Sequence, residues 1–373
     1  MTLSLSTAFD SGNIHLVGIE GDRIDLEILK DNQSDFYQWF HFRLLGAGGR
    51  TVTMRILNAG RSAYPQGWPG YRACVSEDRE HWRRTETSFA DGVLTITHRP
   101  QTDSCWFAYF PPYSIERHHD LVAKALQAEG VSYASLGQTL DGQELDCLSL
   151  GDGAKQIWLF ARQHPGESMA EYWMEGALGM LTDPSNPAAL ALRAKARFHI
   201  VPNANPDGSR RGHLRTNAAG VNLNREWHAP SLERSPEVYH LRAAMDRTGV
   251  DFAIDVHGDE TIPYIFLAGF EGIAAPSEAQ LASYDAFSKA LAARTKDFQT
   301  KHGYGAVPRG QGNMSMATNQ LAARYGAVSM TLEMPFKDNA DQPDPVEGWS
   351  PARSRQLACD CLGALGAIVD SLG

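Results

Sequence analysis

The chain has 373 residues, of which 43% are hydrophobic and 21% are charged, and its formal net charge is −10 at pH 7. This composition is that of a globular protein long enough for about two domains, and it excludes a fibrous or low-complexity chain. The basic residues do not gather into long runs, so the acidic balance argues against nucleic acid as a partner.

The first third of the chain predicts β-structure. Polar and apolar residues alternate in short runs over residues 15–29, 36–44, 51–57 and 93–98, with Gly and other turn residues between the runs. A period of two is typical of half-buried strands. We therefore predict an antiparallel β-sandwich domain over residues 1–113. Pro111 and Pro112 mark its end, because proline cannot donate to a sheet ladder.

Residues 114–373 follow a different pattern, in which apolar strands alternate with helices. Short apolar runs at residues 157–161, 252–256 and 327–332 predict buried strands. Helical periodicity covers residues 118–127, 168–181, 235–247, 279–296, 314–325 and 351–372. This alternation predicts a second, α/β domain with a mixed sheet and helices on both faces.

The sequence also bears on the compartment. Residues 1–13 are polar and rich in Ser and Thr, so we expect no secretory signal, and no stretch is long and apolar enough to span a membrane. The five cysteines are scattered and show no spacing typical of a metal site. Their odd number favours reduced thiols in the cytoplasm.

Three residues of metal-binding types come directly after predicted buried strands. His164 and Glu167 follow the strand at residues 157–161, and His257 follows the strand at 252–256. Ligands of open α/β sheets bind beyond the carboxyl ends of strands, so these side chains should meet at one rim. Two imidazoles and a carboxylate, with one position open for water, suit a catalytic zinc. Each residue alone is more simply explained by a hydrogen bond or a helix cap, and only their joint placement favours a metal.

Glu333 ends the third of these strands. An unpaired carboxylate beside apolar residues is costly unless it has a partner or a task. A general base next to a metal is such a task, because it takes a proton from water and returns it to the leaving amine. The alternative is a salt bridge at the rim of the sheet.

Arg215 and Arg225 lie in a segment dense in Gly, Asn and Arg. A guanidinium group binds carboxylates bidentately and stabilises an oxyanion without losing a proton. Two such groups near a metal indicate a substrate that carries its own carboxylate. The alternative is a pair of solvated loop arginines, which is the interpretation we prefer for Arg210 and Arg211.

Five motifs together resemble the M14 zinc carboxypeptidases, and within them the cytosolic carboxypeptidases, whose eukaryotic members trim glutamates from protein tails. The motifs are RQHPGE at residues 162–167, NANPDG at 203–208, GVNLNREW at 220–227, DVHG at 255–258 and TLE at 331–333. Residues 38–43 (QWFHFR) and 107–113 (FAYFPPY) are similar to the leading β domain of that subfamily. The resemblance covers nearly the whole chain.

The resemblance implies a zinc carboxypeptidase domain over residues 114–373, with one zinc per chain. It also implies hydrolysis of the carboxy-terminal peptide bond of peptides or proteins, with acidic residues such as Glu among those removed. The roles at matching positions are zinc ligands for His164, Glu167 and His257, general acid and base for Glu333, oxyanion stabilisation for Arg215, and a grip on the terminal carboxylate for Asn224 and Arg225.

The sequence departs from the family pattern at Asn222, where many relatives have an aspartate that orients a ligand histidine. An amide oxygen accepts the same hydrogen bond but raises the basicity of the ligand less, so we expect weaker metal affinity. The mobile tyrosine of digestive members is not placed by the sequence, and Tyr304 and Tyr325 are the candidates.

Specificity and two other functions stay open at this stage. Arg309 is our candidate for contact with an acidic terminal side chain, although a loop arginine in solvent is the simpler interpretation. A zinc amidohydrolase acting on small N-acyl amino acids would use the same ligands. An inactive module that binds carboxy-terminal tails is a third reading, but the intact ligands and Glu333 argue against it. The sequence does not give the oligomeric state.

Overall fold

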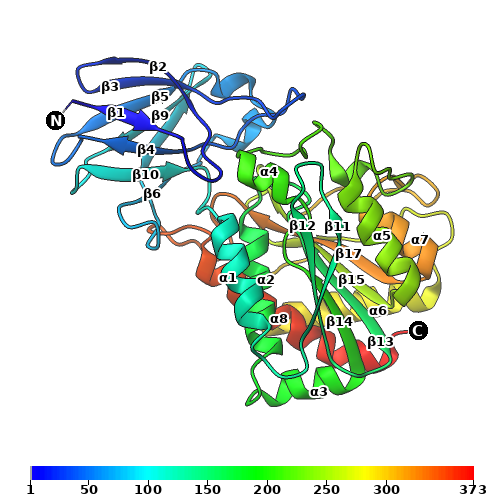
Figure 1. Ribbon diagram of the computed structural model, residues 1–373. Coiled ribbons are helices and arrows are strands. Elements are labelled where there is room, and N and C mark those ends of the chain that lie inside the picture. The colour runs from blue at the N-terminus through cyan, green and yellow to red at the C-terminus, as the bar shows by residue number, and fades with distance from the viewer. Residues whose placement is uncertain (1) are drawn as a thin grey trace.

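The computed structural model describes residues 2–373, which form a β-rich amino-terminal part and a larger α/β part (Figure 1). The strands of the amino-terminal part are β1 (Ser4–Ser6), β2 (His15–Glu20), β3 (Arg23–Glu27), β4 (His41–Leu45), β5 (Val52–Ile56), β6 (Cys74–Ser76), β7 (Arg83–Arg84), β8 (Glu86–Ala90), β9 (Val93–His98) and β10 (Ser104–Ala108). They build two five-stranded sheets, in the orders β1-β4-β10-β6-β7 and β2-β3-β5-β9-β8.

The predicted sandwich is confirmed, with one difference in strand direction. Alternate side chains of both sheets are buried in a common core, as shown by Ile24 and Met54 from one sheet and Phe42 and Phe107 from the other. The rings of Phe42 and Phe107 are stacked at 5.3 Å. β3 and β5, however, pair in parallel, so the sandwich is not wholly antiparallel.

The α/β part is built on a seven-stranded sheet in the order β11-β12-β14-β13-β15-β17-β16. Its strands are β11 (Ser132–Gln138), β12 (Glu144–Leu150), β13 (Lys155–Ala161), β14 (Ala196–Val201), β15 (Phe252–Asp259), β16 (Phe266–Ala268) and β17 (Val328–Pro335). The four inner strands β14, β13, β15 and β17 are parallel, whereas β11, β12 and β16 run antiparallel to their neighbours.

The helices of this part are α1 (Ile115–Ala125), α2 (Met169–Leu181), α3 (Pro187–Lys195), α4 (Pro206–Arg211), α5 (Pro236–Thr248), α6 (Glu278–Arg294), α7 (Ala317–Tyr325) and α8 (Pro351–Ile368). Four short 3-10 helices cover Ala59–Arg61, Pro65–Gly67, Leu223–Arg225 and Val369–Ser371. No helix among residues 2–373 is long and apolar enough to cross a membrane. α3 was not predicted as a helix, although Asn186 caps it and Pro187 stands at its first position, which is an ordinary helix-start signal.

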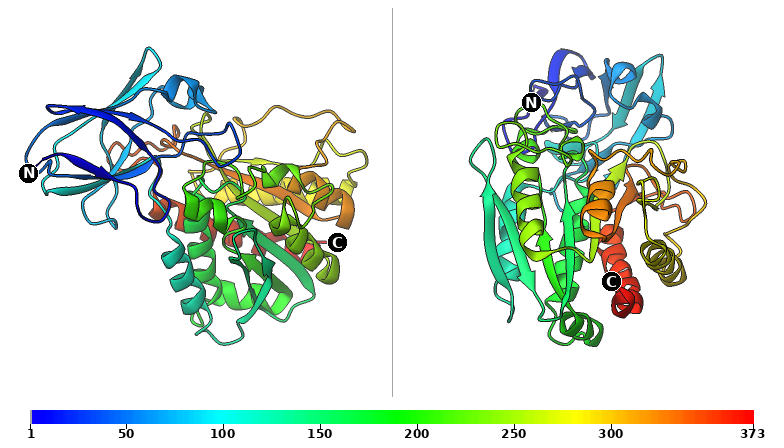
Figure 2. Two further views of the ribbon diagram at one scale, coloured as in Figure 1. Left: turned by 45° about the horizontal axis from the view of Figure 1, so that its top comes forward. Right: turned by 90° about the vertical axis from the view of Figure 1, so that its right-hand side faces the viewer.

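Helices cover both faces of the central sheet, as predicted (Figure 2). Successive residues of β13 point to opposite faces, so Leu159 packs in the core that contains α2 and α8, whereas Phe160 packs in the core that contains α5 and α7. Because both faces are buried, the strand is a continuous apolar run. This is why the sequence predicted its position well.

A buried ionic network supports the turn between β13 and α2. The guanidinium of Arg162 donates to the carbonyl oxygen of Pro165 at 2.6 and 3.0 Å and to Glu171 Oε2 at 2.6 Å. The other oxygen of Glu171 lies 2.6 Å from His118 Nδ1, and His118 Nε2 lies 2.8 Å from Asp146 Oδ2. The network therefore ties α1, α2 and β12 to the turn.

The protonation of His118 gives this network a pH dependence. Burial lowers the pKa of His118, but Glu171 and Asp146 outweigh burial and raise that pKa to about 9. The unfolded chain has a histidine pKa of about 6.5, so protonation favours the folded state. The stabilisation is complete below pH 6.5 and is lost as the pH rises through about 9.

We expect His118→Gln to lower the free energy of unfolding by about 3 kcal/mol at pH 6, and by less at pH 9, because it leaves the buried Asp146 without a cation and leaves Glu171 with Arg162 as its counter-charge. Denaturant unfolding at both pH values measures this. His119→Gln is the matched control, since His119 is exposed. Equal losses at pH 6 and pH 9 would contradict the charged state of His118.

Candidate metal centre and active site

The predicted donor residues meet at the carboxyl ends of the parallel strands. His164 and Glu167 lie on the turn between β13 and α2, and His257 lies near the end of β15. His257 is in direct register with Glu333 on β17. All four side chains are buried. The sheet thus delivers them to one rim, as the strand-end argument requires.

Three donor groups converge on one point. His164 Nδ1 lies 2.7 Å from Glu167 Oε1, His257 Nδ1 lies 2.8 Å from Glu167 Oε2, and the two Nδ1 atoms are 3.1 Å apart. Two nitrogens at this distance share at most one proton. The set of two imidazoles and one carboxylate is that of a catalytic metal with a free coordination position.

The other ring nitrogens of the two histidines have polar neighbours. His164 Nε2 donates to Asn222 Oδ1 at 3.0 Å, which is the contact expected from the sequence. His257 Nε2 lies 2.8 Å from Asp255 Oδ1, an ionic contact whose angles do not make a hydrogen bond. A proton held at Nε2 leaves the lone pair on Nδ1, so both rings are oriented to bind a metal.

The charges of the donor set also fit a cation. Burial, followed by the charge of Arg215, lowers the pKa of His164 to about 3. Against burial, Asp255 and Glu167 raise the pKa of His257 well above its ordinary value. Also against burial, the two histidines lower the pKa of Glu167. The negative charges of Asp255 and Glu167 therefore favour a positive charge at this point.

Glu333, the predicted base, has a hydroxyl group as its neighbour. Its Oε1 lies 3.0 Å from the hydroxyl of Tyr304, which also lies 2.8 Å from Asp259 Oδ2. Burial, together with the charges of Glu167 and Asp259, raises the pKa of Glu333 well above the ordinary range. Since the hydroxyl has one proton, it donates to either Asp259 or Glu333, but not to both at once. Among the described residues, Glu333 Oε2 has no hydrogen-bond partner.

A cavity of about 400 Å³ encloses these groups. It brings together the predicted site residues His164, Glu167, Arg215, Asn224, Arg225, His257 and Glu333. Arg309 is exposed and does not belong to the cavity lining. Tyr304 lines the cavity, whereas Tyr325 lies elsewhere and donates to Asp246. The structure thus separates the two tyrosine candidates.

The amino-terminal part holds Arg215 in place, which the sequence did not predict. The carboxylate of Asp31 accepts the backbone N–H groups of Leu214, Arg215 and Thr216 at 2.7, 2.8 and 2.9 Å. The guanidinium of Arg215 lies over the ring of Tyr64, 5.4 Å from its centroid. An acidic residue before a turn was the only local signal, and it does not name its partner. The site is therefore built from both parts of the chain.

Asn224 and Arg225 lie on the short helix Leu223–Arg225 at the edge of the cavity. Asn224 Oδ1 accepts from the backbone N–H of Ala317, which fixes its side chain. Burial and the neighbouring charge of Arg215 lower the pKa of Arg225. Two guanidinium groups that repel each other favour an anion between them.

Sequence reasoning also missed Glu260, a buried carboxyl in the cavity wall. Burial and the charge of Glu167 raise the pKa of Glu260 well above its ordinary value. Glu260 follows the predicted strand end by only three residues, so its place in the chain was a usable signal.

The fold and the site define a metal-dependent hydrolase. The family model "Zinc carboxypeptidase" matches residues 121–342, and the model "Cytosolic carboxypeptidase N-terminal domain" matches residues 5–110. The chain belongs to the zinc carboxypeptidase family, and it is a peptide hydrolase.

The relatives of the chain agree with this assignment. An uncharacterized protein of Zymomonas mobilis is 59% identical over 100% of this chain and 98% of its own length. A metallo-carboxypeptidase of Pseudomonas aeruginosa, solved with (2-guanidinoethylmercapto)succinic acid, is 42% identical with a TM-score of 0.97, over 99% of this chain and 100% of that one. Human cytosolic carboxypeptidase 1 is 27% identical over 72% of this chain, which corresponds to 26% of the human protein.

Asn222 gives a direct test of the metal centre. We expect Asn222→Asp to bind Zn²⁺ about ten-fold more tightly, because a carboxylate raises the basicity of His164 more than an amide does. Competition with a chelator measures the affinity. Aspartate also caps a helix start, so the fold should be retained, and the unfolding midpoint of the metal-free protein is the control. Unchanged or weaker affinity would contradict this role of Asn222.

Proposed function

We propose that the protein is a zinc-dependent carboxypeptidase that removes single residues from the carboxy terminus of peptides or proteins in the cytoplasm. The observation that carries the proposal is that the predicted metal ligands, the predicted base and two arginines line one cavity. A convergent His-Glu-His donor set, the buried Glu333 and two arginines all face the same space. The names of the cytosolic relatives support the compartment.

His164, Glu167 and His257 would hold the zinc. When bound, it supplies Lewis acidity that polarises the scissile carbonyl group and acidifies water. Glu333 takes the proton of the attacking water and transfers it to the leaving amine. Arg215 donates to the oxyanion of the tetrahedral intermediate, and its fixed positive charge stabilises the negative charge that develops there.

Asn224 and Arg225 bind the terminal carboxylate of the substrate in this proposal. The repulsion between Arg225 and Arg215 is relieved when an anion enters, so a free carboxylate is preferred over an amide end. The Tyr304 hydroxyl lies within hydrogen-bond distance of both Asp259 and Glu333. These residues therefore select the last peptide bond.

The amino-terminal part shapes the substrate site in this proposal. We treat residues 1–113 and 114–373 as two domains, and Asp31 reaches from the first to the loop of Arg215 in the second. A substrate site shaped by two domains suits a peptide or protein tail better than a small molecule.

The base assignment has a specific test. We expect Glu333→Gln to lower turnover by about 100- to 10,000-fold, because the amide cannot take a proton from water, while zinc content stays the same. Peptide hydrolysis and metal analysis on the same preparation measure both quantities. Turnover equal to that of the unaltered protein would remove Glu333 as the base.

The terminal residue is tested with peptides that end in Glu, Asp, Lys, Phe or Ala. We propose that peptides with acidic ends are preferred and that Arg309 contacts the acidic terminal side chain. Arg309→Ala should then raise KM for the peptide ending in Glu and leave KM for the peptide ending in Ala unchanged. Asp259 and Glu260 in the cavity oppose this preference. Preferred release of Lys would overturn it, and hydrolysis of N-acyl amino acids alone would replace the peptide substrate.

A further inference from the structure

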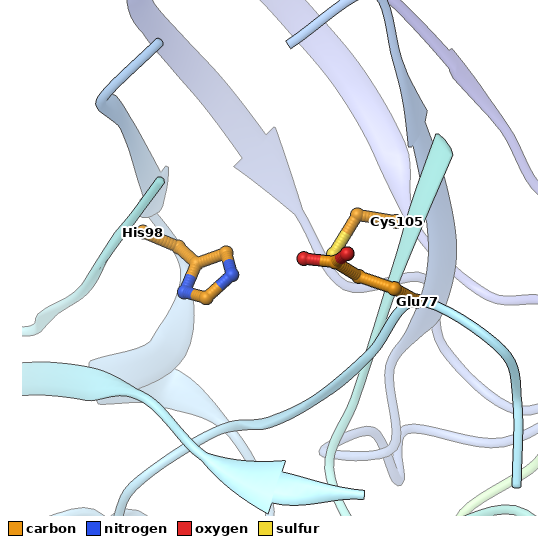
Figure 3. A group of neighbouring side chains, drawn as sticks. All are labelled: Glu77, His98 and Cys105. Carbon is orange, nitrogen blue, oxygen red and sulfur yellow. The ribbon is translucent and has the colours of Figure 1, made fainter. Parts of the chain in front are cut away.

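A second group of metal-binding side chains lies in the amino-terminal sandwich. Glu77 follows β6, His98 ends β9, and Cys105 is near the start of β10 (Figure 3). One donor atom from each residue lies within 4.8 Å of the other two. β6 and β10 belong to one sheet and β9 to the other, so the group lies between the two sheets.

The register explains how distant residues meet there. Trp106 of β10 pairs with Ser76 of β6, so Cys105 and Glu77 are the next residues along the same antiparallel ladder. His98 comes from the opposite sheet, just before the loop of residues 99–103 that crosses to β10. Its ring faces Glu77 and Cys105 (Figure 3).

His98 carries a free lone pair in this group. Its Nδ1 lies 2.9 Å from Thr85 Oγ1, and that hydroxyl donates its only proton to the carbonyl oxygen of Thr97. In this arrangement His98 Nδ1 donates to Thr85, and the lone pair is on Nε2, where it is available to a metal. Nε2 is buried and has no hydrogen-bond partner within residues 2–373. A buried polar atom without a partner requires an explanation.

The other two side chains complete a donor set. Cys105 is a free thiol that is only 1% exposed, and burial, with the charge of Glu77, raises its pKa to about 12. Glu77 Oε1 accepts from the backbone N–H of Gln101, which fixes the carboxylate beside the thiol. Imidazole, thiolate and carboxylate are the ligands that zinc and similar metals use.

We propose that Glu77, His98 and Cys105 bind a divalent transition metal, with zinc as the expected ion, as a structural centre that joins the two sheets of the sandwich. Binding releases the thiol proton to solvent, so affinity rises with pH. The contact of His98 with Thr85 orients the imidazole in the way that metal-binding histidines are usually held.

Cobalt distinguishes this centre from the hydrolytic one, because the proposed hydrolytic ligands His164, Glu167 and His257 include no sulfur. The full chain, stripped of metal and titrated with Co²⁺ at pH 8, should bind two equivalents. One equivalent should produce a thiolate-to-cobalt charge-transfer band in the near ultraviolet. Cys105→Ser should abolish that band, reduce binding to one equivalent and leave peptide hydrolysis unchanged.

Cys74→Ser is the matched control, since Cys74 is a buried thiol on the neighbouring strand β6 and should leave the band intact. Glu77→Gln serves as a second variant if Cys105→Ser folds poorly, and it should weaken Co²⁺ binding at this centre at least ten-fold. No sulfur band in the unaltered protein, or a band that persists in Cys105→Ser, would overturn the proposal. Absence of hydrolysis with the band present would instead count against the proposed function alone.

Discussion

The active-site turn depends on the buried guanidinium of Arg162. This residue has a positive φ of 60°, and its side chain turns back to bind the carbonyl oxygen of Pro165, one residue after His164. A buried cation is tolerated only with a counter-charge, which Glu171 on α2 supplies. Glu171 is held in turn by His118. Ionic contacts from His118 on α1 through Glu171 and Arg162 therefore fix the turn that carries His164 and Glu167. The shape of this turn does not depend on a bound ligand.

The second constraint is the joint between the two parts of the chain. Three successive backbone N–H groups around Arg215 end on the carboxylate of Asp31, so the loop that carries this arginine takes its shape from the amino-terminal part. Tyr64, from the same part, lies against the guanidinium. Because a loop without such partners would be mobile, the contacts with the sandwich fix the position of Arg215 in the cavity.

The sequence predicted features that depend on neighbouring residues better than contacts between residues that lie far apart in the chain. The meeting of His164, Glu167, His257 and Glu333 in one cavity was predictable because each follows a local apolar run, and parallel strands end at one rim. The partner of Asp31, the choice of Tyr304 over Tyr325 and the exposed position of Arg309 depend on loops with no periodicity. Cys105 showed no metal-type spacing because its neighbours Glu77 and His98 come from two other segments that meet it only in the folded sandwich. The parallel pairing of β3 with β5 is likewise a non-local choice.

In the proposed function, metal binding changes the protonation state of Glu333, because both lie in one cavity. Glu167, Asp259, Glu260 and Glu333 lie around one space, and Arg215 and Arg225 offset part of their negative charge within its lining. Burial, together with the charge of Glu167, raises the pKa values of both Glu333 and Glu260 and so favours their protonated forms. A divalent cation at Glu167 replaces the repulsion with attraction and lowers both pKa values. Metal binding would then release the proton from Glu333, so that this carboxylate becomes a base only when the metal is in place.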